Sequence, residues 1–587
     1  MPYNHFDYVP SSVSHNRSVF RFEKAVSTGG EIGYLYPICA PVRMFPGSSL
    51  SLDIGAEVRS GSLIAPLQDS VVFDCFAFKV PNRIVWEHWK QFLGAVDDVL
   101  FDNLTEYKIP SFNYGGCVGL TITGKEAYYT SHLLATCFEL PYVSAPDTGT
   151  MVNKINALPF RGYTFIWNEF FRPEQLVDPI LFSKTDDGAS GQNMDITTIS
   201  VNFNGSTLDV VAPGINSPSG NTQIAGGCVL PTFRVHKSLW SSCLPKPSLE
   251  TLNLLGGLTA PVGISNTGPS VSANTQMSVY SPTTATPGSG TFLNMRGYTG
   301  YVTSDMYADL NQALLTVNNY RETIMLQNYY DALNRAGSRY DELLRTLFHT
   351  NSPEAVIDIP ELIVHKRFVI YRKEVVATAT TNYGESKVQT LGSQGSYIDT
   401  VVKDDFFTTS CTEHSYVHML WTIRPNIIRM GNGFEPKWTQ LDKFDQYYPQ
   451  FDGMGDVPRY DHEVFVSSDL NTGLDFTSSA IFGYQEYGAE DKYQRNSAVG
   501  WMNPNVPGHI PGFTLTEVLG STPSLVPSNR AGIGSYISCI VEEEAFARCL
   551  AISDPTLSPQ FIVDFRLSGT IVHPMPVYNI PGMGDLL

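Results

Sequence analysis

Apolar and polar residues alternate along much of the chain with the period of two that is typical of β-strands. Residues 49–54 alternate in this way, and residues 71–78 form a denser apolar run that predicts a strand buried on both faces. After Pro360 the strand patterns return, and a strong strand begins at Phe561. Predicted β-segments therefore lie at both ends of the sequence.

Helical spacing of apolar residues occurs in three places. Residues 81–94 predict a short amphipathic helix with an aromatic face, and residues 160–176 predict a second one. Residues 307–350 form the one long helical region, which Gly337 divides into two helices.

Two long stretches between these elements have unusual compositions. Residues 184–230 are polar but contain a predicted hairpin, in which apolar residues alternate on both sides of Asn204 and Gly205. Residues 251–300 carry a single charged residue, Arg296. This composition allows a linker, but interspersed Leu, Val, Met, Tyr and Phe favour an ordered insertion.

The order of these elements predicts the fold class. β-segments flank helices and long insertions, and regular alternation of strand and helix is missing from the pattern. An antiparallel sandwich or jelly roll with elaborated loops therefore fits best, and a doubly wound fold does not.

Composition narrows the classes of function. The chain has 587 residues, of which 42% are hydrophobic and only 16% are charged, and its net charge is −19. A protein whose main task is to bind nucleic acid is expected to be basic, because neutralisation of phosphates supplies most of that affinity. If this protein encloses DNA, most of the neutralising charge must come from cations, polyamines or a separate basic peptide.

The nine cysteines are dispersed and no CxxC motif occurs, which predicts free thiols in a reducing compartment. The first residues contain no apolar stretch like that of a signal peptide, and no apolar run reaches the length of a membrane span. We therefore expect a protein made in the cytoplasm, without membrane insertion.

Known catalytic and ligand-binding motifs are incomplete or missing. Residues 119–126 resemble a phosphate-binding loop, but Glu126 replaces the hydroxyl residue that would hold magnesium. Cys411, His414 and His418 could suggest a metal site, but they read as one strand on which Cys411 faces away from the two histidines. We predict no enzyme activity, no cofactor and no metal.

The N-terminal residues are the one local basic feature. Arg17, Arg21 and Lys24 lie close to Phe20 and Phe22, a combination that suits single-stranded nucleic acid through phosphate contacts and base stacking. The alternatives are a mobile or interface-bound arm with ordinary solvated charges, or a contact with another protein.

Three tryptophans are candidates for packing between subunits: Trp86, Trp89 and Trp167. Trp86 and Trp89 would pack their helix onto the sandwich or onto a neighbouring subunit. The other interpretation is that they belong only to the core of one chain.

Seven segments resemble major capsid proteins of the microvirus family, in particular its gokushovirus-like branch. They occur in the family's order and span nearly the whole chain: VPNRIVWEHWKQFLG from Val80, LPFRGYTFIWNEFFRPEQL from Leu158, SLWSSCLPKP from Ser238, AGSRYDELLRTLF from Ala336, TEHSYVHMLWTIRP from Thr412, IFGYQEYGAEDKY from Ile481 and FIVDFRLSGTIVHPMPVYNIPG from Phe561. Each match is modest alone, but seven in register are specific.

The resemblance implies a mainly β fold, an eight-stranded antiparallel jelly roll of the viral capsid type with long loop insertions and a few helices. It also implies a T=1 icosahedral shell around circular single-stranded DNA, assembled in the cytoplasm of a bacterial host. The implied partners are other copies of the chain, the encapsidated DNA, a small basic DNA-binding protein, an internal scaffolding protein, a pilot or minor capsid protein and a receptor on the host surface. The last six residues, GMGDLL, depart from the usual family ending.

The resemblance also suggests a division of the chain. It comprises an N-terminal arm (1–30), the first part of the jelly roll with loop helices (31–182), inserted loops (183–306) that include the expected threefold protrusion (251–300), a helical segment (307–350), and the second part of the jelly roll with the C-terminal tail (351–587). Residues 184–230 are the alternative source of the protrusion.

Two other functions compete with a capsid role. A carbohydrate-binding sandwich or cell-surface adhesin would be expected to carry an export signal. A jelly-roll glycosidase would need two carboxylates facing one another across a cleft, and the sequence alone does not show which carboxylates meet.

Overall fold

The structure is a computed structural model of the full chain. It describes residues 17–63, 67, 70–94, 107–113, 134–141, 154–172, 184, 198–204, 207–211, 223–225, 230–231, 243–244, 246–247, 259–261, 307–309, 317–336, 339–349, 357–376, 381–383, 387–389, 394–425, 429–430, 434–464, 481–494, 517–518, 546, 549–550 and 559–578.

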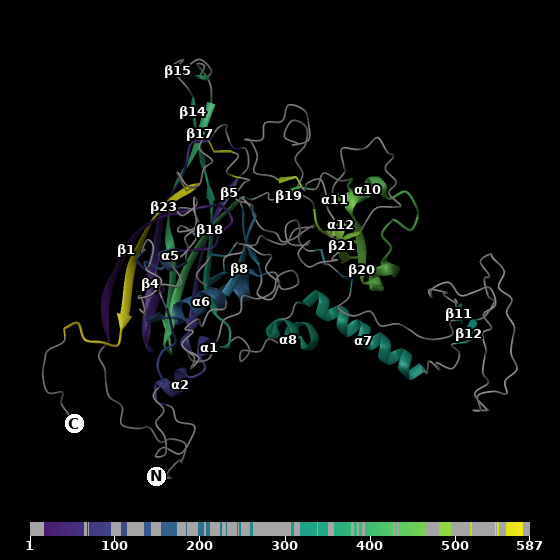
Figure 1. Cartoon of the computed structure of the whole chain (residues 1–587), viewed down its shortest axis with the longest axis horizontal. Coiled ribbons are helices and arrows are strands. Elements are labelled where there is room, and N and C mark those ends of the chain that lie inside the picture. Colours follow the sequence, from purple (N-terminus) through teal and green to yellow (C-terminus); the bar gives the residue numbers. More distant parts are fainter. Residues whose placement is uncertain are drawn as a thin grey trace, which may run out of the picture. The chain divides into compact units, whose positions relative to one another are not determined.

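Two five-stranded antiparallel sheets dominate the described residues (Figure 1). The first sheet has, in spatial order, β1 (Ser18–Gly30), β23 (Phe561–His573), β4 (Ser48–Ser60), β17 (Gln394–Cys411) and β14 (Arg372–Val376). The second has β13 (Glu361–Ile370), β5 (Val71–Pro81), β18 (Ser415–Pro425) and β2 (Tyr36–Pro37), and β3 (Val42–Met44) also pairs with β18. Strands from both ends of the sequence are thus neighbours in the first sheet.

The first sheet has one buried face, as its alternating sequence predicts. In β4, Leu50, Leu52 and Ile54 are at most 1% exposed, whereas Asp53 is exposed. In β23, Phe561, Val563 and Phe565 are buried, whereas Ile562 and Asp564 between them face outward. A period of two therefore directs one side chain in every pair into the space between the sheets.

The second sheet is buried on both faces at its centre. Almost every residue of β5 and β18 is buried, which confirms the prediction for residues 71–78. On the inner face, the ring of Phe565 from the first sheet lies 6.0 Å from that of Phe73 and 5.9 Å from that of Trp421. Tyr36 stacks on Trp421 at 4.8 Å, so the aromatic core joins the two sheets.

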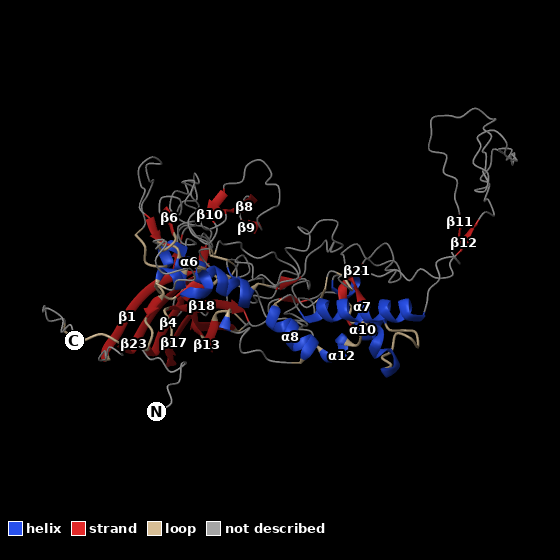
Figure 2. Cartoon of the chain, turned by 90° about the horizontal axis from the view of Figure 1, so that it is seen from below, coloured by secondary structure: helices blue, strands red, loops and turns tan. Residues whose placement is uncertain are grey.

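Helices of the same chain cover the outer face of this second sheet (Figure 2). They are α6 (Leu158–Ile166), followed by the π-helical turn η1 (Trp167–Phe171). Phe170 and Phe171 pack against Phe78 and Phe76, with ring centroids 4.9 and 5.2 Å apart. The predicted helix at 160–176 is confirmed as far as Phe171, and the rest of that segment lies outside the described residues.

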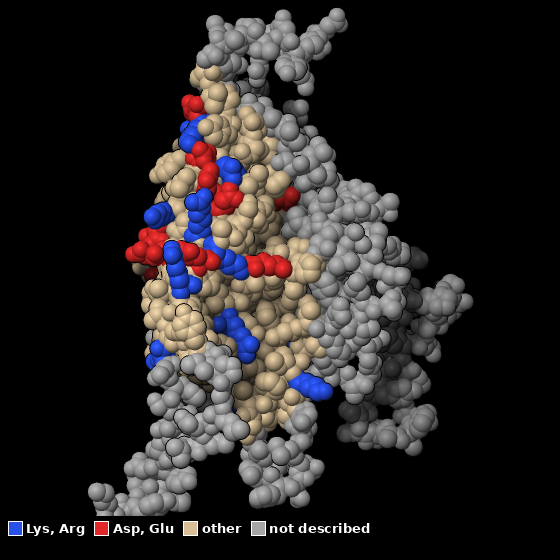
Figure 3. Space-filling model, turned by 90° about the vertical axis from the view of Figure 1, so that its left-hand side faces the viewer, with Lys and Arg blue, Asp and Glu red and all other residues tan. Residues whose placement is uncertain are grey.

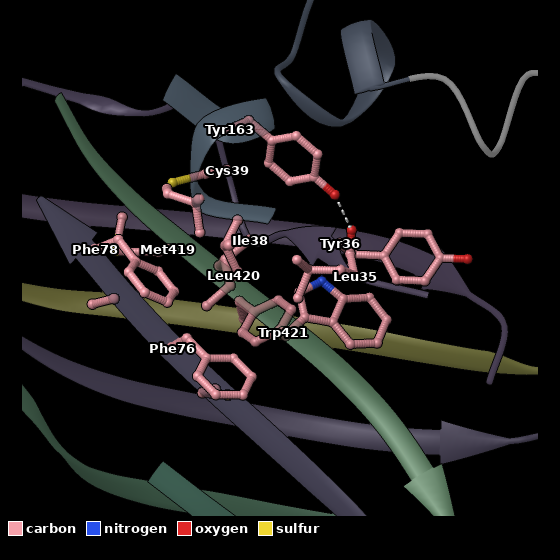
Figure 4. Packing of buried hydrophobic residues seen from close by; sticks show 14 of the residues in the cluster. Leu35, Tyr36, Ile38, Cys39, Phe76, Phe78, Tyr163, Met419, Leu420 and Trp421 are labelled. Carbon is pink, nitrogen blue, oxygen red and sulfur yellow. Dashed lines mark hydrogen bonds between the residues drawn. The ribbon is translucent and has the colours of Figure 1, made fainter. Parts of the chain in front are cut away.

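A tyrosine hydroxyl ties α6 to the core. The hydroxyl of Tyr163 donates a hydrogen bond of 2.6 Å to the carbonyl oxygen of Leu35, next to the Tyr36–Trp421 stack (Figure 4). Both partners are fully buried, where a satisfied polar group costs little and an unsatisfied one costs much.

The predicted helix at 81–94 is wrong in extent. Two short helices, α1 (Asn82–Val85) and α2 (Trp89–Phe92), replace it. Trp86 between them is extended, with φ −148°, because it turns into the core and packs against Trp89 at 6.0 Å. Tertiary packing of the two tryptophans overrides the helical spacing of the sequence.

The N-terminal arm is also shorter than predicted. Residues 18–30 form β1, which pairs with β23 along its whole length from Ser18 to Gly30. The prediction of an arm is wrong for these residues because the alternation of β1 supplies a half-buried face, and residues 1–16 lie outside the described part.

Short strands form the remaining sheets. The predicted hairpin is confirmed by β8 (Thr198–Asn204) and β9 (Thr207–Val211), whose register pairs Asn204 with Thr207. The other small sheets contain β10 (Gln223–Ala225) beside β8, β6 (Ser111–Asn113) with β7 (Lys154–Asn156), β11 (Thr259–Pro261) with β12 (Tyr307–Asp309), β15 (Thr381–Tyr383) with β16 (Lys387–Gln389), β20 (Asp456–Tyr460) with β21 (Ile481–Glu486), and the parallel pair β19 (Arg429–Met430) and β22 (Glu517–Val518).

The long helical region is confirmed as two helices, α7 (Val317–Ala336) and α8 (Tyr340–Phe348), on either side of Gly337. Its predicted start is wrong, because residues 307–309 form β12. The other helices are short: α5 (Leu134–Cys137), α10 (Pro436–Thr439), the 3₁₀ turn η3 (Pro449–Met454), α11 (Asp461–Val464) and α12 (Ala489–Lys492).

The chain divides into two compact units. One comprises residues 1–247 and 336–587 and contains both large sheets, and the other comprises residues 248–335 and contains β11, β12 and most of α7. Most of the predicted insertion at 251–300 lies outside the described residues.

We expect Gly569→Ala to weaken the first sheet, because a Cβ at this position of β23 would overlap the backbone oxygen of Ser51 on β4. Forcing this overlap should lower the free energy of unfolding by about 1–3 kcal/mol. Gly395→Ala is the matched control, since nothing lies within 4 Å of a Cβ there. Equal midpoints of chemical denaturation for the two variants would contradict the close packing of β23 on β4.

Candidate assembly surfaces

The three predicted tryptophans lie inside the chain. Trp86, Trp89 and Trp167 are 0%, 6% and 3% exposed. Trp89 also packs against the ring of His414 at 5.4 Å. They belong to the core of one chain and leave almost no surface for a neighbouring subunit. The prediction that they pack between subunits is therefore wrong.

The three predicted basic residues do not form one patch. Arg21 and Lys24 point to opposite faces of β1: Arg21 is exposed and paired with Glu23, and Lys24 is half-buried, with its Nζ 2.6 Å from a carboxylate oxygen of Glu139. Arg17 precedes the strand and lies beside Gly47. The alternation of a strand separates residues that are close in sequence.

The outer face of the first sheet carries charges of both signs (Figure 3). Arg59 of β4 pairs with Glu57 on its own strand and with Asp564 of β23. Lys373 of β14 pairs with Asp399 of β17. Mixed charge of this kind does not resemble the concentrated positive surface of a nucleic-acid groove.

A buried carboxylate organises the outer face of the second sheet. Asp74 on β5 is 1% exposed, and one of its oxygens accepts a 2.7 Å hydrogen bond from Nε of Arg424 on β18. The other oxygen lies 3.1 Å from Nε of Arg367 and 3.0 Å from Nε2 of His365, both on β13. Burial alone would raise the pKa of Asp74, but the hydrogen bonds from His365, Arg424 and Arg367 and the charge of Arg424 lower it below its ordinary value.

The segment with Cys411, His414 and His418 is a hairpin and not one strand. Cys411 ends β17, His414 lies in the turn, and His418 is on β18. The ring of His418 is buried next to Gly162 of α6 and Phe138, and burial lowers its pKa to about 3, so the ring is neutral. Within the described ranges, no group of three or more His, Cys, Asp or Glu side chains could hold a metal ion.

Several other predicted features fall partly or wholly outside the described residues. The phosphate-loop-like residues 119–126 and the last residues of the chain are among them. Cys39, Cys75, Cys137 and Cys411 are free thiols, and burial raises the pKa of Cys39 to about 11 and that of Cys137 to about 12. A search of the described helices found none long and apolar enough to cross a membrane.

A surface that the sequence analysis did not identify lies at residues 434–456. Trp438, Leu441 and Phe444 are 70%, 85% and 66% exposed, which is unusual for large apolar side chains so close in sequence. Their spacing of three residues would equally suit the buried face of a helix. Only the accessible surface of the folded chain distinguishes the two cases.

A second partly apolar surface follows the outer side of β13. Val369 and Tyr371 are 46% and 68% exposed, and the side chain of Arg367 is 49% exposed. Beside them is an open cavity of about 350 Å³, lined by Leu67, Ser70, Val71, Val369, Ile370, Tyr371, Arg372 and Ile398. The cavity is open to solvent, and most of its lining residues are apolar.

Comparison with known proteins shows the family to which the chain belongs. The model of the family described as "Capsid protein (F protein)" matches residues 9–583. The chain belongs to this capsid protein family. Its function is therefore structural, and the predicted resemblance to microvirus capsid proteins is confirmed.

Curated relatives match along nearly their whole length. The chain is 26% identical to capsid protein VP1 of Chlamydia phage 1, over 99% of this chain and 98% of that protein. It is 25% identical to capsid protein VP1 of Bdellovibrio phage phiMH2K, over 98% and 97% of the two chains, and 25% identical to capsid protein VP1 of Spiroplasma virus 4, over 94% and 92%. A phage capsid protein belongs to the virion and assembles with copies of itself.

We expect Asp74→Asn to destabilise the fold by about 3–5 kcal/mol, because it leaves the buried guanidinium of Arg424 without its carboxylate. The wild type should also lose this stabilisation in acid. The pKa of Asp74 is below its ordinary 3.8 in the folded state, so the contribution is present above that pH and disappears as the pH falls through the folded value.

Denaturation of both proteins between pH 7 and pH 2 measures this effect, with Asp399→Asn as a control at an ion pair that is partly exposed. If Asp74→Asn and Asp399→Asn unfold alike at neutral pH, the buried pair does not stabilise the second sheet.

Proposed function

We propose that this chain is a microvirus major capsid protein whose copies assemble into a T=1 icosahedral shell that encloses a circular single-stranded DNA genome. The observation that carries the proposal is the match of the capsid family model to residues 9–583. The two packed antiparallel sheets support it, because a sandwich of this kind can meet its copies through several different edges and so close a shell.

The proposed core is an eight-stranded jelly roll. One sheet would contribute β1, β23, β4 and β17, and the other β18, β5, β13 and the two short strands β2 and β3 counted as one interrupted strand. Pairing of β2 and β3 with successive parts of β18 supports this count, and β14 would be an addition at the sheet edge.

The charge of the chain constrains how DNA would be held. The net charge is −19, and the exposed face of the first sheet mixes both signs. The proposal therefore includes a small basic DNA-binding protein inside the shell. Arg17 and Arg21 remain the N-terminal residues proposed to touch DNA, whereas Lys24 would first have to leave Glu139.

An internal scaffolding protein, a pilot or minor capsid protein and a host receptor complete the proposed partners. The assembly would take place in the cytoplasm of a bacterial host. The segment 251–300 is proposed as a surface protrusion for host attachment, because its many small polar residues can present hydrogen-bonding groups with little charge.

Electron microscopy of the purified chain, with and without a scaffolding protein of a related phage, tests the shell. We expect closed particles of uniform diameter whose mass corresponds to a T=1 shell, and nuclease-protected circular single-stranded DNA in native particles. Purified material that forms only monomers or irregular aggregates under every condition would contradict the shell.

Deletion of residues 251–300 tests the attachment role. We expect the shortened protein to form shells of normal size that adsorb poorly to host cells, since the deleted segment would contact the receptor and not the sandwich. Adsorption is measured as the loss of free particles from a cell suspension. Shells that no longer form would show that the segment is needed for assembly, and normal adsorption would exclude it as the attachment site.

A further inference from the structure

We propose that residues 438–444 of one copy dock against the outer side of β13 and its adjoining cavity on a second copy. This inference rests on the proposed function, in which copies of the chain form a shell. It identifies two surfaces of the subunit that would meet.

The donor surface is apolar and already ordered in the single chain. One carboxylate oxygen of Asp445 accepts hydrogen bonds of 3.0 and 2.8 Å from the backbone N–H groups of Leu441 and Asp442. Lys443 lies over the ring of Phe444 at 4.6 Å. The loop therefore holds Leu441 and Phe444 out toward solvent in one conformation, and a surface that is ordered before binding loses less entropy on association.

The acceptor surface is a ridge on one side of β13. His365, Arg367 and Val369 are two residues apart, so they share the outer face of the strand. Tyr371 continues the ridge to the mouth of the 350 Å³ cavity, whose walls include Leu67 and Val71. An exposed apolar loop and an open apolar cavity on the same molecule are the two halves of a head-to-tail contact.

The charges around the two surfaces are complementary. Residues 434–456, which include the donor surface and its flanks, contain five carboxylates and two lysines, a net charge of −3. On the ridge, Arg367 and Arg424 share the single carboxylate of Asp74, so one positive charge is in excess. Opposite surplus charges beside matching apolar surfaces favour this pairing and disfavour a contact of either surface with its own copy.

Within one chain the two surfaces do not cover each other. Leu441, Trp438 and Tyr371 are 85%, 70% and 68% exposed with the whole chain present. A partner that covers them would therefore come from another molecule. A second copy is the occupant we infer, because it carries the complementary surface.

A photo-reactive amino acid placed at Leu441 tests the contact directly. Full-length chains with this group are mixed with isotope-labelled wild-type chains under conditions in which shells form, and the cross-linked peptides are identified by mass spectrometry. We expect links from residue 441 to labelled peptides that contain residues 361–376 or 67–71. Links confined to other parts of the labelled chain, or to the same chain, would overturn the inference.

A double-mutant comparison gives an independent test. Leu441→Ser and Tyr371→Ser should each weaken association at least about tenfold, as expected for large buried side chains at the centre of an interface. The double variant should associate about as strongly as the single variant with the larger defect, because both changes remove the same contact. Sedimentation measures association, and circular dichroism checks that each variant folds.

Tyr578→Ser is the matched control, because this aromatic side chain is 83% exposed and belongs to neither surface. If wild-type shells form and the Leu441 and Tyr371 variants associate normally, only this inference fails. If the wild type never associates, the proposed function fails with it.

Discussion

The described fold depends on the antiparallel pairing of β5 with β18, because this pair is covered on both sides. Phe73 and Trp421 pack on the first sheet through Phe565, and the opposite face receives α6 and η1. Polar groups in such a place must find partners in the protein. Asp74 does so through Arg424, and Gly162 lets α6 approach β18 so closely that a Cβ there would lie 2.7 Å from Nε2 of His418.

This double coverage explains where the aromatic residues of the chain are. Helices of the same chain cover the second sheet, so Trp86, Trp89 and Trp167 are buried inside the chain. Many of the large apolar side chains that remain exposed lie elsewhere, among them those on residues 438–444, on β13 and β14, and on α7 and α8. A chain with only 16% charged residues is suited to cover such surfaces with neighbours, because the centres of permanent interfaces are depleted in charge.

Ion pairs within the chain limit the positive charge that is left to bind DNA in the proposed shell. Many carboxylates of the described residues pair with cations of the same chain, as at Asp74, Asp399 and Glu139. Those cations are therefore occupied by the fold itself. In the proposed shell, an acidic subunit of this kind would leave the neutralisation of enclosed phosphate to other molecules, which agrees with the net charge of −19.

The sequence by itself determined the class of fold and the family. Alternation in residues 49–54 and in the final strand predicted these strands correctly, because burial of one face of a sheet imposes a period of two. The dense apolar run at 71–78 predicted its strand because that strand is buried on both faces. Gly337 marked the break between two helices for an equally local reason. Only the tertiary structure decided which apolar residues at helical spacing are buried and which are exposed. Trp86 and Trp89 share the spacing of Trp438 and Leu441, yet the first pair is buried and the second is exposed. Spacing describes one element, whereas burial depends on which other element packs against it, and those partners come from distant parts of the chain.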